Sequence, residues 1–289
     1  EAIVALGKMK NAAALLEILK TVNIDLLPGS VMNAVLAGGA EIIKELAPHF
    51  TSLKSNAQCL IVRAASYMGN DDISLNLLKD NWDIEDLAVR YYILNALVRK
   101  NYQAVGSDRR SVELLLEKEL SWTVFYRKKQ IIIPNESACL ILKEFIQRAI
   151  DLSKERLLML LSFIYDPADL IKIKIALKSG NVDSISYALE MLDVKLLSKH
   201  KADVLCLFVE PENSISGANF NELLKEILQN KDKMFNQGLI VATIYHVGEN
   251  NLQEFIPLIA YYLSSADEEI KETAQWAANK LGRSLVEEH

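Results

Sequence analysis

The chain has 289 residues, of which 51% are hydrophobic and 24% are charged, and its formal net charge is −6. This length provides for one large domain or two ordinary ones with a substantial core. The negative charge disfavours general nucleic-acid binding. Few aromatic residues and almost no alternating β-branched runs disfavour an all-β fold. The low content of 11 Gly and 6 Pro favours long helices joined by short turns.

Three cysteines, Cys59, Cys139 and Cys206, lie far apart in apolar stretches. An odd number without CxxC spacing predicts neither a disulfide framework nor a zinc site, and buried reduced thiols fit a reducing compartment. No signal peptide is visible, and the longest strongly apolar run, 157–164, is far shorter than the ~20 residues needed to span a bilayer. We therefore expect a soluble, cytoplasmic chain, which could be cut from a larger membrane-bound polypeptide.

The N-terminal stretch AIVALGK (2–8) is similar to AANKLGR (277–283). This similarity predicts that the chain opens on the last helix of a repeat, as a fragment of a longer protein would. Further along, Gly38-Gly39 follows an apolar helix and precedes another, which predicts a kink or a site of close packing.

Residues 71–100 predict a short helix, a polar turn at Asp80-Asn81 and a longer helix. Asp71 and Asp83 precede apolar stripes, where a carboxylate can accept hydrogen bonds from free backbone N–H groups. We therefore interpret such carboxylates as helix caps and not as acid–base catalysts.

The segment 90–129 is unusually basic, with nine Lys or Arg against four Asp or Glu, a net of +5, whereas 249–289 carries −5. The stretch ELSWTVFYRKKQIII (119–133), which starts inside this segment, places Trp122, Phe125 and Tyr126 beside Arg127, Lys128 and Lys129. Such a mixture can bind phosphates, acidic partners or an anionic membrane face. The alternative is a long, irregular helix with aromatic residues in the core and basic residues in solvent. The candidate contact residues are Arg109, Arg110, Trp122, Tyr126, Arg127, Lys128 and Lys129.

The chain repeats itself further on. Residues 170–197 and 256–282 align at an offset of 86, which we interpret as two units of about 43 residues, within the range of HEAT-type repeats. The alignment places Leu177 on Leu263, Ser179 on Ser265, Asn181 on Asp267 and Ala188 on Ala274.

Apolar residues elsewhere also recur at helical spacing, for example over 220–228, and about seventeen helices are expected. The pattern predicts an all-α fold: a HEAT-like α-α superhelix, a right-handed solenoid of antiparallel helix pairs. We expect a single domain over 1–289 with a longer helical insertion near 101–150. In this interpretation Ala188 and Leu192 are packing residues at a helix–helix contact.

Three stretches carry a resemblance to a known family: LLLEKEL (114–120), KEFIQRAIDLSKERLLMLLSFIYDPADLI (143–171) and ALEMLDVKLL (188–197). They resemble the HEAT-repeat cytoplasmic region of bacterial nucleotide-transporter-like membrane proteins, of the ADP/ATP translocase or major-facilitator type. In that family a cyclic-nucleotide-binding domain often follows. The chain departs from the family where an Arg is usual and Ile185-Ser186-Tyr187 stands. The positions that match are Leu160, Leu161, Tyr165, Pro167, Ala188, Leu189, Glu190, Leu192 and Asp193.

No motif of known chemistry accompanies these repeats. The four histidines, His49, His200, His246 and His289, do not form an HExxH pattern, and no glycine-rich phosphate loop or GxSxG occurs. We therefore expect no catalytic residue, no cofactor and no metal, and no nucleic-acid partner.

The sequence predicts a non-enzymatic scaffold for protein–protein interaction or regulation. The resemblance places it in the cytoplasmic part of a bacterial membrane transporter-like protein, at the inner face of the membrane. Its partner would be another protein, neighbouring domains of the same chain, or an anionic membrane surface. The alternatives are a free-standing soluble adaptor and a HEAT-like DNA-repair glycosylase.

Overall fold

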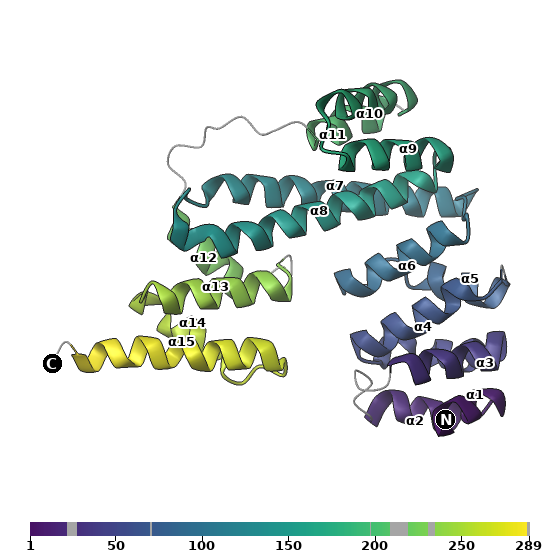
Figure 1. The fold of residues 1–289 in the computed structure, drawn as a ribbon, viewed down its shortest axis with the longest axis horizontal. Coiled ribbons are helices and arrows are strands. Elements are labelled where there is room, and N and C mark those ends of the chain that lie inside the picture. Colours follow the sequence, from purple (N-terminus) through teal and green to yellow (C-terminus); the bar gives the residue numbers. More distant parts are fainter. Residues whose placement is uncertain (22–27, 70, 197, 209–218, 231–234, 288–289) are drawn as a thin grey trace. The chain divides into compact units, whose positions relative to one another are not determined.

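The computed structural model describes residues 1–21, 28–69, 71–196, 198–208, 219–230 and 235–287 (Figure 1). Every regular element in these residues is helical, so the prediction of an all-α fold is confirmed. Contacts divide the chain into two compact units. Unit 1 comprises Glu1–Leu116 and Arg156–Lys195, and unit 2 comprises Glu117–Glu155 and Leu196–His289. The expectation of a single repeat domain over 1–289 stays a prediction.

Unit 1 is built mainly from short helix pairs. Its helices are α1 (Ala2–Lys8), α2 (Ala12–Thr21), α3 (Pro28–Leu46), the 3-10 helix η2 (Ala47–Ser52), α4 (Ser55–Tyr67), α5 (Asp72–Asp80), α6 (Leu87–Arg99), α9 (Pro167–Lys178) and α10 (Val182–Lys195). It also holds the start of α7 (Ser107–Ile132) and the end of α8 (Leu140–Ser162), the long helices of the range where an insertion was expected.

Unit 2 contains the rest of α7 and α8, and its core is formed between them and the C-terminal helices. Between α7 and α8 lies the 3-10 helix η3 (Ser137–Cys139). The C-terminal part of the unit contains α11 (Ser198–Cys206), α12 (Phe220–Gln229), α13 (Gln237–Glu249), η4 (Gln253–Phe255), α14 (Ile256–Tyr262) and α15 (Glu268–Glu287). Helix α12 shows why the pattern folds this way. Its apolar stripe of Leu223, Leu224, Ile227 and Leu228 is buried, and its polar residues lie on the opposite face.

The turns of the two aligned stretches share their hydrogen bonds. In the α9–α10 turn the Ser179 hydroxyl accepts from the Asn181 backbone N–H (3.2 Å), and in the α14–α15 turn Ser265 accepts from Asp267 in the same way (3.2 Å). The side chains of Asn181 and Asp267 each accept from the backbone N–H three residues later, at 3.1 and 3.0 Å. The correspondence predicted at these positions is therefore confirmed at the level of the turn.

Helices α4 and α6 lie side by side and run in parallel, which sets the local spacing along the chain. The hydroxyl of Ser55 at the start of α4 donates to Asp86 at the start of α6, and Tyr67 at the end of α4 lies under Arg99 at the end of α6. The contacting residues of α4 and α6 are thus 31 or 32 positions apart in the sequence. This spacing is shorter than the predicted repeat length of about 43 residues.

Helices α13 and α15 lie side by side in the same manner (Figure 1). Tyr245 stacks on Trp276 with the ring centroids 5.0 Å apart and the planes 10° from parallel. One helical turn further, Lys280 Nζ lies 3.3 Å from a carboxylate oxygen of Glu249. Both pairs join residues 31 apart, so the shorter spacing recurs in unit 2.

The predicted helix cap at Asp71 and the predicted kink at Gly38-Gly39 are present in the structure, whereas the predicted cap at Asp83 is not. Asp71 caps α5 as expected, accepting from the Ser74 backbone N–H at 2.7 Å. Asp83 is not the cap of α6; Asp86 takes that role, and Asp83 lies in the preceding turn. Gly39, with φ of 65°, breaks the helical geometry of α3 and so confirms the predicted kink.

Small residues permit close helix contact at the predicted positions. Ala188 and Leu192 of α10 are fully buried, as is Ala274 of α15. The packing interpretation of 160–197 is therefore confirmed at these positions.

Candidate partner-binding surface

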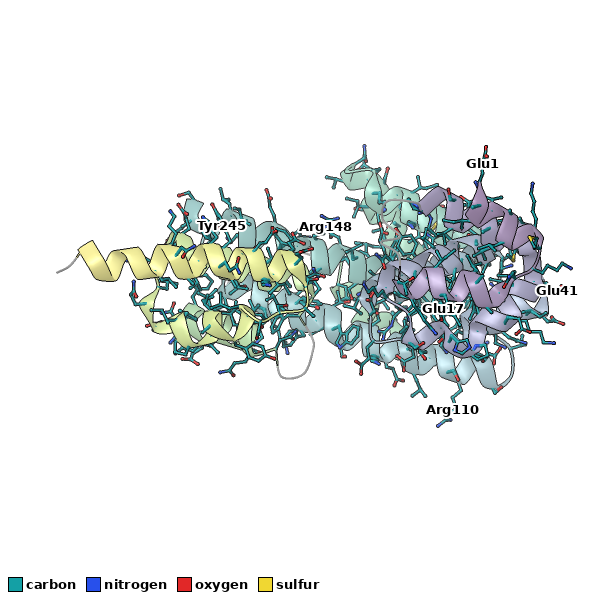
Figure 2. The ribbon with its side chains drawn as sticks, turned by 90° about the horizontal axis from the view of Figure 1, so that it is seen from below. Glu1, Glu17, Glu41, Arg110, Arg148 and Tyr245 are labelled. Carbon is teal, nitrogen blue, oxygen red and sulfur yellow. The ribbon has the colours of Figure 1, made fainter. Side chains whose placement is uncertain are left out.

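The two arginines at the start of α7 lie in unit 1 and are exposed. The Arg109 guanidinium lies 3.6 Å from Glu113, one helical turn further along the same helix. Arg110 forms no such pair with a described residue, and its side chain projects away from the ribbon (Figure 2). The Arg110 guanidinium is therefore more accessible to a binding partner than the Arg109 guanidinium.

The basic residues near the end of α7 lie in unit 2. Lys128 is exposed, whereas Arg127 and Lys129 are half-buried. The ammonium group of Lys129 pairs with Glu226 of α12 and lies 5.1 Å from the ring centroid of Phe125. Lys129 is therefore already engaged by a carboxylate and an aromatic ring.

The aromatic candidates occupy different environments. Trp122 is half-buried, with Lys118 Nζ 5.6 Å from its ring centroid. Tyr126 is only 1% exposed and packs edge-on against Phe235 in the core of unit 2. Helical periodicity turns the Tyr126 ring inward, so the partner contact expected for this residue stays a prediction that the buried ring does not favour.

Two cations of the +5 segment, Arg90 and Lys100, are buried and contribute nothing to an exposed positive surface. Arg90 is 2% exposed and donates to the Ile84 carbonyl oxygen from Nε and Nη2, at 3.0 and 2.6 Å. Lys100 is 7% exposed and donates to the carbonyl oxygens of Met68 and Gly69. Counting charges along 90–129 therefore overstates the charge that a partner would meet.

A second group of cations and aromatic rings lies on α4 and α6 in unit 1. Arg63 and Tyr67 of α4 are exposed, as are Tyr92 and Arg99 of α6; we name these four residues the arginine–tyrosine face. The Arg99 guanidinium lies 5.4 Å from the ring centroid of Tyr67. A hydrogen bond from Arg99, its positive charge and that of Arg63 lower the pKa of Tyr67. Both guanidinium groups thus act on one phenol oxygen.

The sequence contained a signal for this face that charge counting missed. Neither Ser55–Tyr67 nor Leu87–Arg99 contains an Asp or Glu, although 38 acidic residues are spread through the chain. The parallel stacking of the two helices brings their acid-free faces together.

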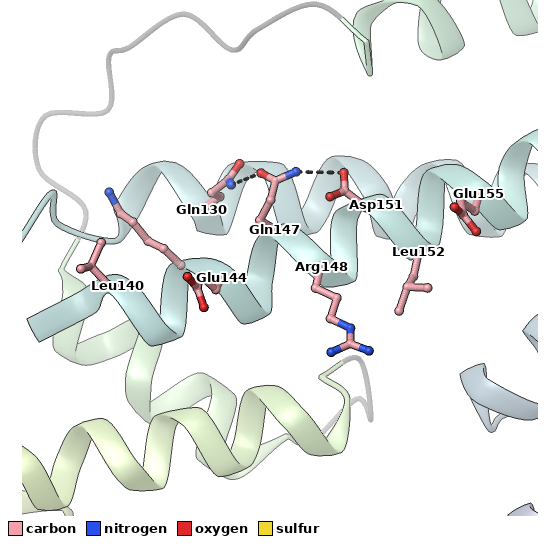
Figure 3. A pocket seen from close by; sticks show the side chains of 9 residues that line it. Gln130, Leu140, Glu144, Gln147, Arg148, Asp151, Leu152 and Glu155 are labelled. Carbon is pink, nitrogen blue, oxygen red and sulfur yellow. Dashed lines mark hydrogen bonds between the residues drawn. The ribbon is translucent and has the colours of Figure 1, made fainter. Parts of the chain in front are cut away.

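A shallow groove of about 490 Å³ follows one face of α8 in unit 2 (Figure 3). Gln130 of α7 donates to the Gln147 side chain, which donates to Asp151 at 2.9 Å. Charges of both signs mix along the wall, with Arg148 between carboxylates, so the groove offers no set of groups aimed at one ligand. The lining residues are Gln130, Leu140, Lys143, Glu144, Gln147, Arg148, Asp151, Leu152 and Glu155.

The two cysteine side chains that the structure describes, Cys59 and Cys139, both have raised pKa values. Burial, more than the nearby Asp86 carboxylate, raises the pKa of Cys59 to about 11, and burial also raises the pKa of Cys139. Both groups are therefore protonated at neutral pH and are weak nucleophiles. The Cys206 side chain lies outside the described residues. Within the described part, no three His, Cys, Asp or Glu side chains are grouped to hold a metal ion.

Comparison with known proteins places the chain in no family. No family model matches it, and no curated protein and no solved structure is significantly similar. None of the helices in the described part of the chain combines the length and the hydrophobicity required to cross a lipid bilayer.

Proposed function

We propose that the chain is a non-enzymatic helical-repeat scaffold for protein–protein interaction or regulation, folded as a HEAT-like superhelix. The observation that carries the scaffold proposal is the parallel stacking of α4 on α6 and of α13 on α15, with the same turn chemistry in two helix pairs. The HEAT-like part of the proposal rests on the sequence resemblance. One helix pair cannot bury its own apolar stripe, whereas stacked pairs cover one another and leave an extended surface for partners. Fold alone does not define a function, so the role rests on the surfaces that the stack presents.

The setting we propose is the cytoplasmic part of a bacterial transporter-like membrane protein. It is supported by the resemblance of 114–120, 143–171 and 188–197 to the HEAT-repeat region of that family. In this setting the exposed cations of α7 would meet the anionic inner leaflet, where each Lys or Arg near the surface adds about 1 kcal/mol.

The test uses vesicles and the cations of α7 that are exposed. Arg110→Gln with Lys128→Gln removes two positive charges without breaking an ion pair of a described residue. The matched control, Lys44→Gln with Lys271→Gln, removes two exposed charges on α3 and α15. Binding to phosphatidylserine-containing vesicles is measured by co-sedimentation at low and at physiological salt.

We expect the native chain to bind, salt to weaken binding, and the α7 variant to bind several-fold less than the control. If the native chain does not bind anionic vesicles, or if the α7 variant and the control bind them with equal affinity, the membrane-facing role of α7 is refuted.

A further inference from the structure

The arginine–tyrosine face is a cationic surface on α4 and α6 whose arginines are not paired with a carboxylate of a described residue. Tyr67 is 58% exposed and Tyr92 is 38% exposed, so both rings are available to a partner. Neither Arg63 nor Arg99 forms an ion pair with a carboxylate of a described residue, whereas Lys10, Lys79 and Lys129 each do. Arg and Tyr are the residue types most enriched at energetically important positions of protein interfaces.

The spacing of the two arginines follows from the parallel stack. Arg99 is level with Tyr67, which is four residues beyond Arg63, so the two arginines differ by about 6 Å along the helix axes. Neighbouring helix axes lie ~9 Å apart, which gives a separation of about 11 Å between the two positions. An extended chain of the polyproline II type has three residues per turn and advances ~3.1 Å per residue, so carboxylates three residues apart lie on one side, about 9 Å apart, and would reach both guanidinium groups.

We propose that the arginine–tyrosine face binds an acidic, extended segment of a partner protein, with carboxylates on Arg63 and Arg99 and the intervening residues against Tyr67 and Tyr92. Guanidinium groups bind carboxylates through two parallel hydrogen bonds, and exposed tyrosine rings supply apolar contact area at low entropic cost. The inference rests on the proposed scaffold function and names the chemistry of one partner.

Charge decides against the other polyanions. Recognition of an anionic membrane generally uses a cluster of roughly 4–8 Lys or Arg, and this face has two. Nucleic-acid binding neutralises several phosphates at once, which requires more cations than the two arginines of this face. A short peptide with a few carboxylates matches two arginines.

The test measures fluorescence anisotropy of a fluorescein-labelled 12-residue peptide with Glu at every third position and Ser between. The Gln version of the peptide serves as the uncharged probe. The site variant is Arg63→Gln with Arg99→Gln. The matched control is Lys44→Gln with Lys271→Gln, which removes the same charge at two exposed positions that have no assigned role. Far-UV circular dichroism and the thermal midpoint verify that each variant keeps the native fold.

We expect saturable binding of the Glu peptide, none of the Gln peptide, a loss of roughly tenfold in the site variant and less than about threefold in the control. Should the double variant unfold, Arg63→Gln alone gives the result, with an expected loss of at least about threefold. The proposal is overturned if the Glu peptide does not bind, or if site and control variants lose affinity equally.

It is also overturned if phosphatidylserine vesicles or a dT20 oligonucleotide bind this face more tightly than the peptide does. Failure of the α7 variant on vesicles would leave this result unaffected, because the two experiments change different candidate binding residues and use different probes.

Discussion

Lys100 ties the end of α4 to the start of α5, and its replacement tests the packing of unit 1. Its ammonium group donates to the carbonyl oxygens of Met68 (3.1 Å) and Gly69 (2.7 Å) and to the Ser74 hydroxyl (3.2 Å). The Asp71 carboxylate, which caps α5, lies close enough to interact with the same charge. Lys100→Met keeps the length of the side chain and removes all these hydrogen bonds.

The magnitude follows from opposing terms. Three hydrogen bonds from a charged donor, at ~1.5–3 kcal/mol each, would give ~5–9 kcal/mol if they were fully additive. Burial of the ammonium group lowers the pKa of Lys100, which shows that desolvation opposes the charged form. Methionine also gains from apolar contact. We therefore expect a net loss of about 3 kcal/mol in the free energy of unfolding.

The assay is urea denaturation followed by far-UV circular dichroism. Lys44→Met, the same chemical change at an exposed position of α3, is the matched control and should stay within about 0.5 kcal/mol of the native chain. If Lys100→Met unfolds at the same urea concentration as the control, the three hydrogen bonds do not stabilise unit 1 and the reasoning is refuted.

Two further predictions concern buried side chains. Leu192→Ala should cost about 2–5 kcal/mol in the same assay, because Leu192 is fully buried in α10; a loss below about 1 kcal/mol would contradict its packing role. Burial lowers the pKa of His246 despite its hydrogen bond to the Ala138 carbonyl oxygen and the nearby Glu136. The folded state then binds this proton less readily than the unfolded state, so stability should fall as the pH drops below about 6.5. The difference between the urea midpoints at pH 7.5 and pH 5 should therefore be larger for the native chain than for His246→Gln. An equal difference in the two proteins would rule out this contribution.

Local features of the fold were predictable because short-range chemistry determines them. The turn at Ser179 and Asn181 and its counterpart at Ser265 and Asp267 use the same side chains to satisfy the same backbone groups. The kink at Gly39 likewise depends on a backbone conformation that glycine adopts readily.

The repeat length was not predictable from the same alignment. The aligned helix pairs are not neighbours, because α11, α12 and α13 lie between them. Dividing the offset of 86 by two assumes equal steps, whereas α12 and α14, which start adjacent pairs, begin 36 residues apart, at Phe220 and Ile256. Similar turns indicate that helix pairs recur along the chain. They do not determine the number of residues between one pair and the next.

The candidate surface shows a different limit. A charge count treats Arg90 and Lys100 as surface cations, yet both point inward and bind carbonyl oxygens. Arg63 and Arg99 are 36 residues apart in the chain and share a face only because α4 and α6 stack in parallel. Side-chain orientation and helix stacking therefore determine which cations are exposed and which of them share a surface. The composition of a segment does not.

The 31–32-residue stacking also bears on how the chain folds. Contacts such as Ser55 with Asp86 and Glu249 with Lys280 join residues close in sequence, so each closes only a short loop. Folding rates rise as the mean sequence separation of contacts falls, and helical arrays with local contacts are among the fastest folders. Helix α6 can therefore dock on α4, and α15 on α13, as soon as about one further repeat has been synthesised, so each of these two stacks can form while the ribosome is still adding residues.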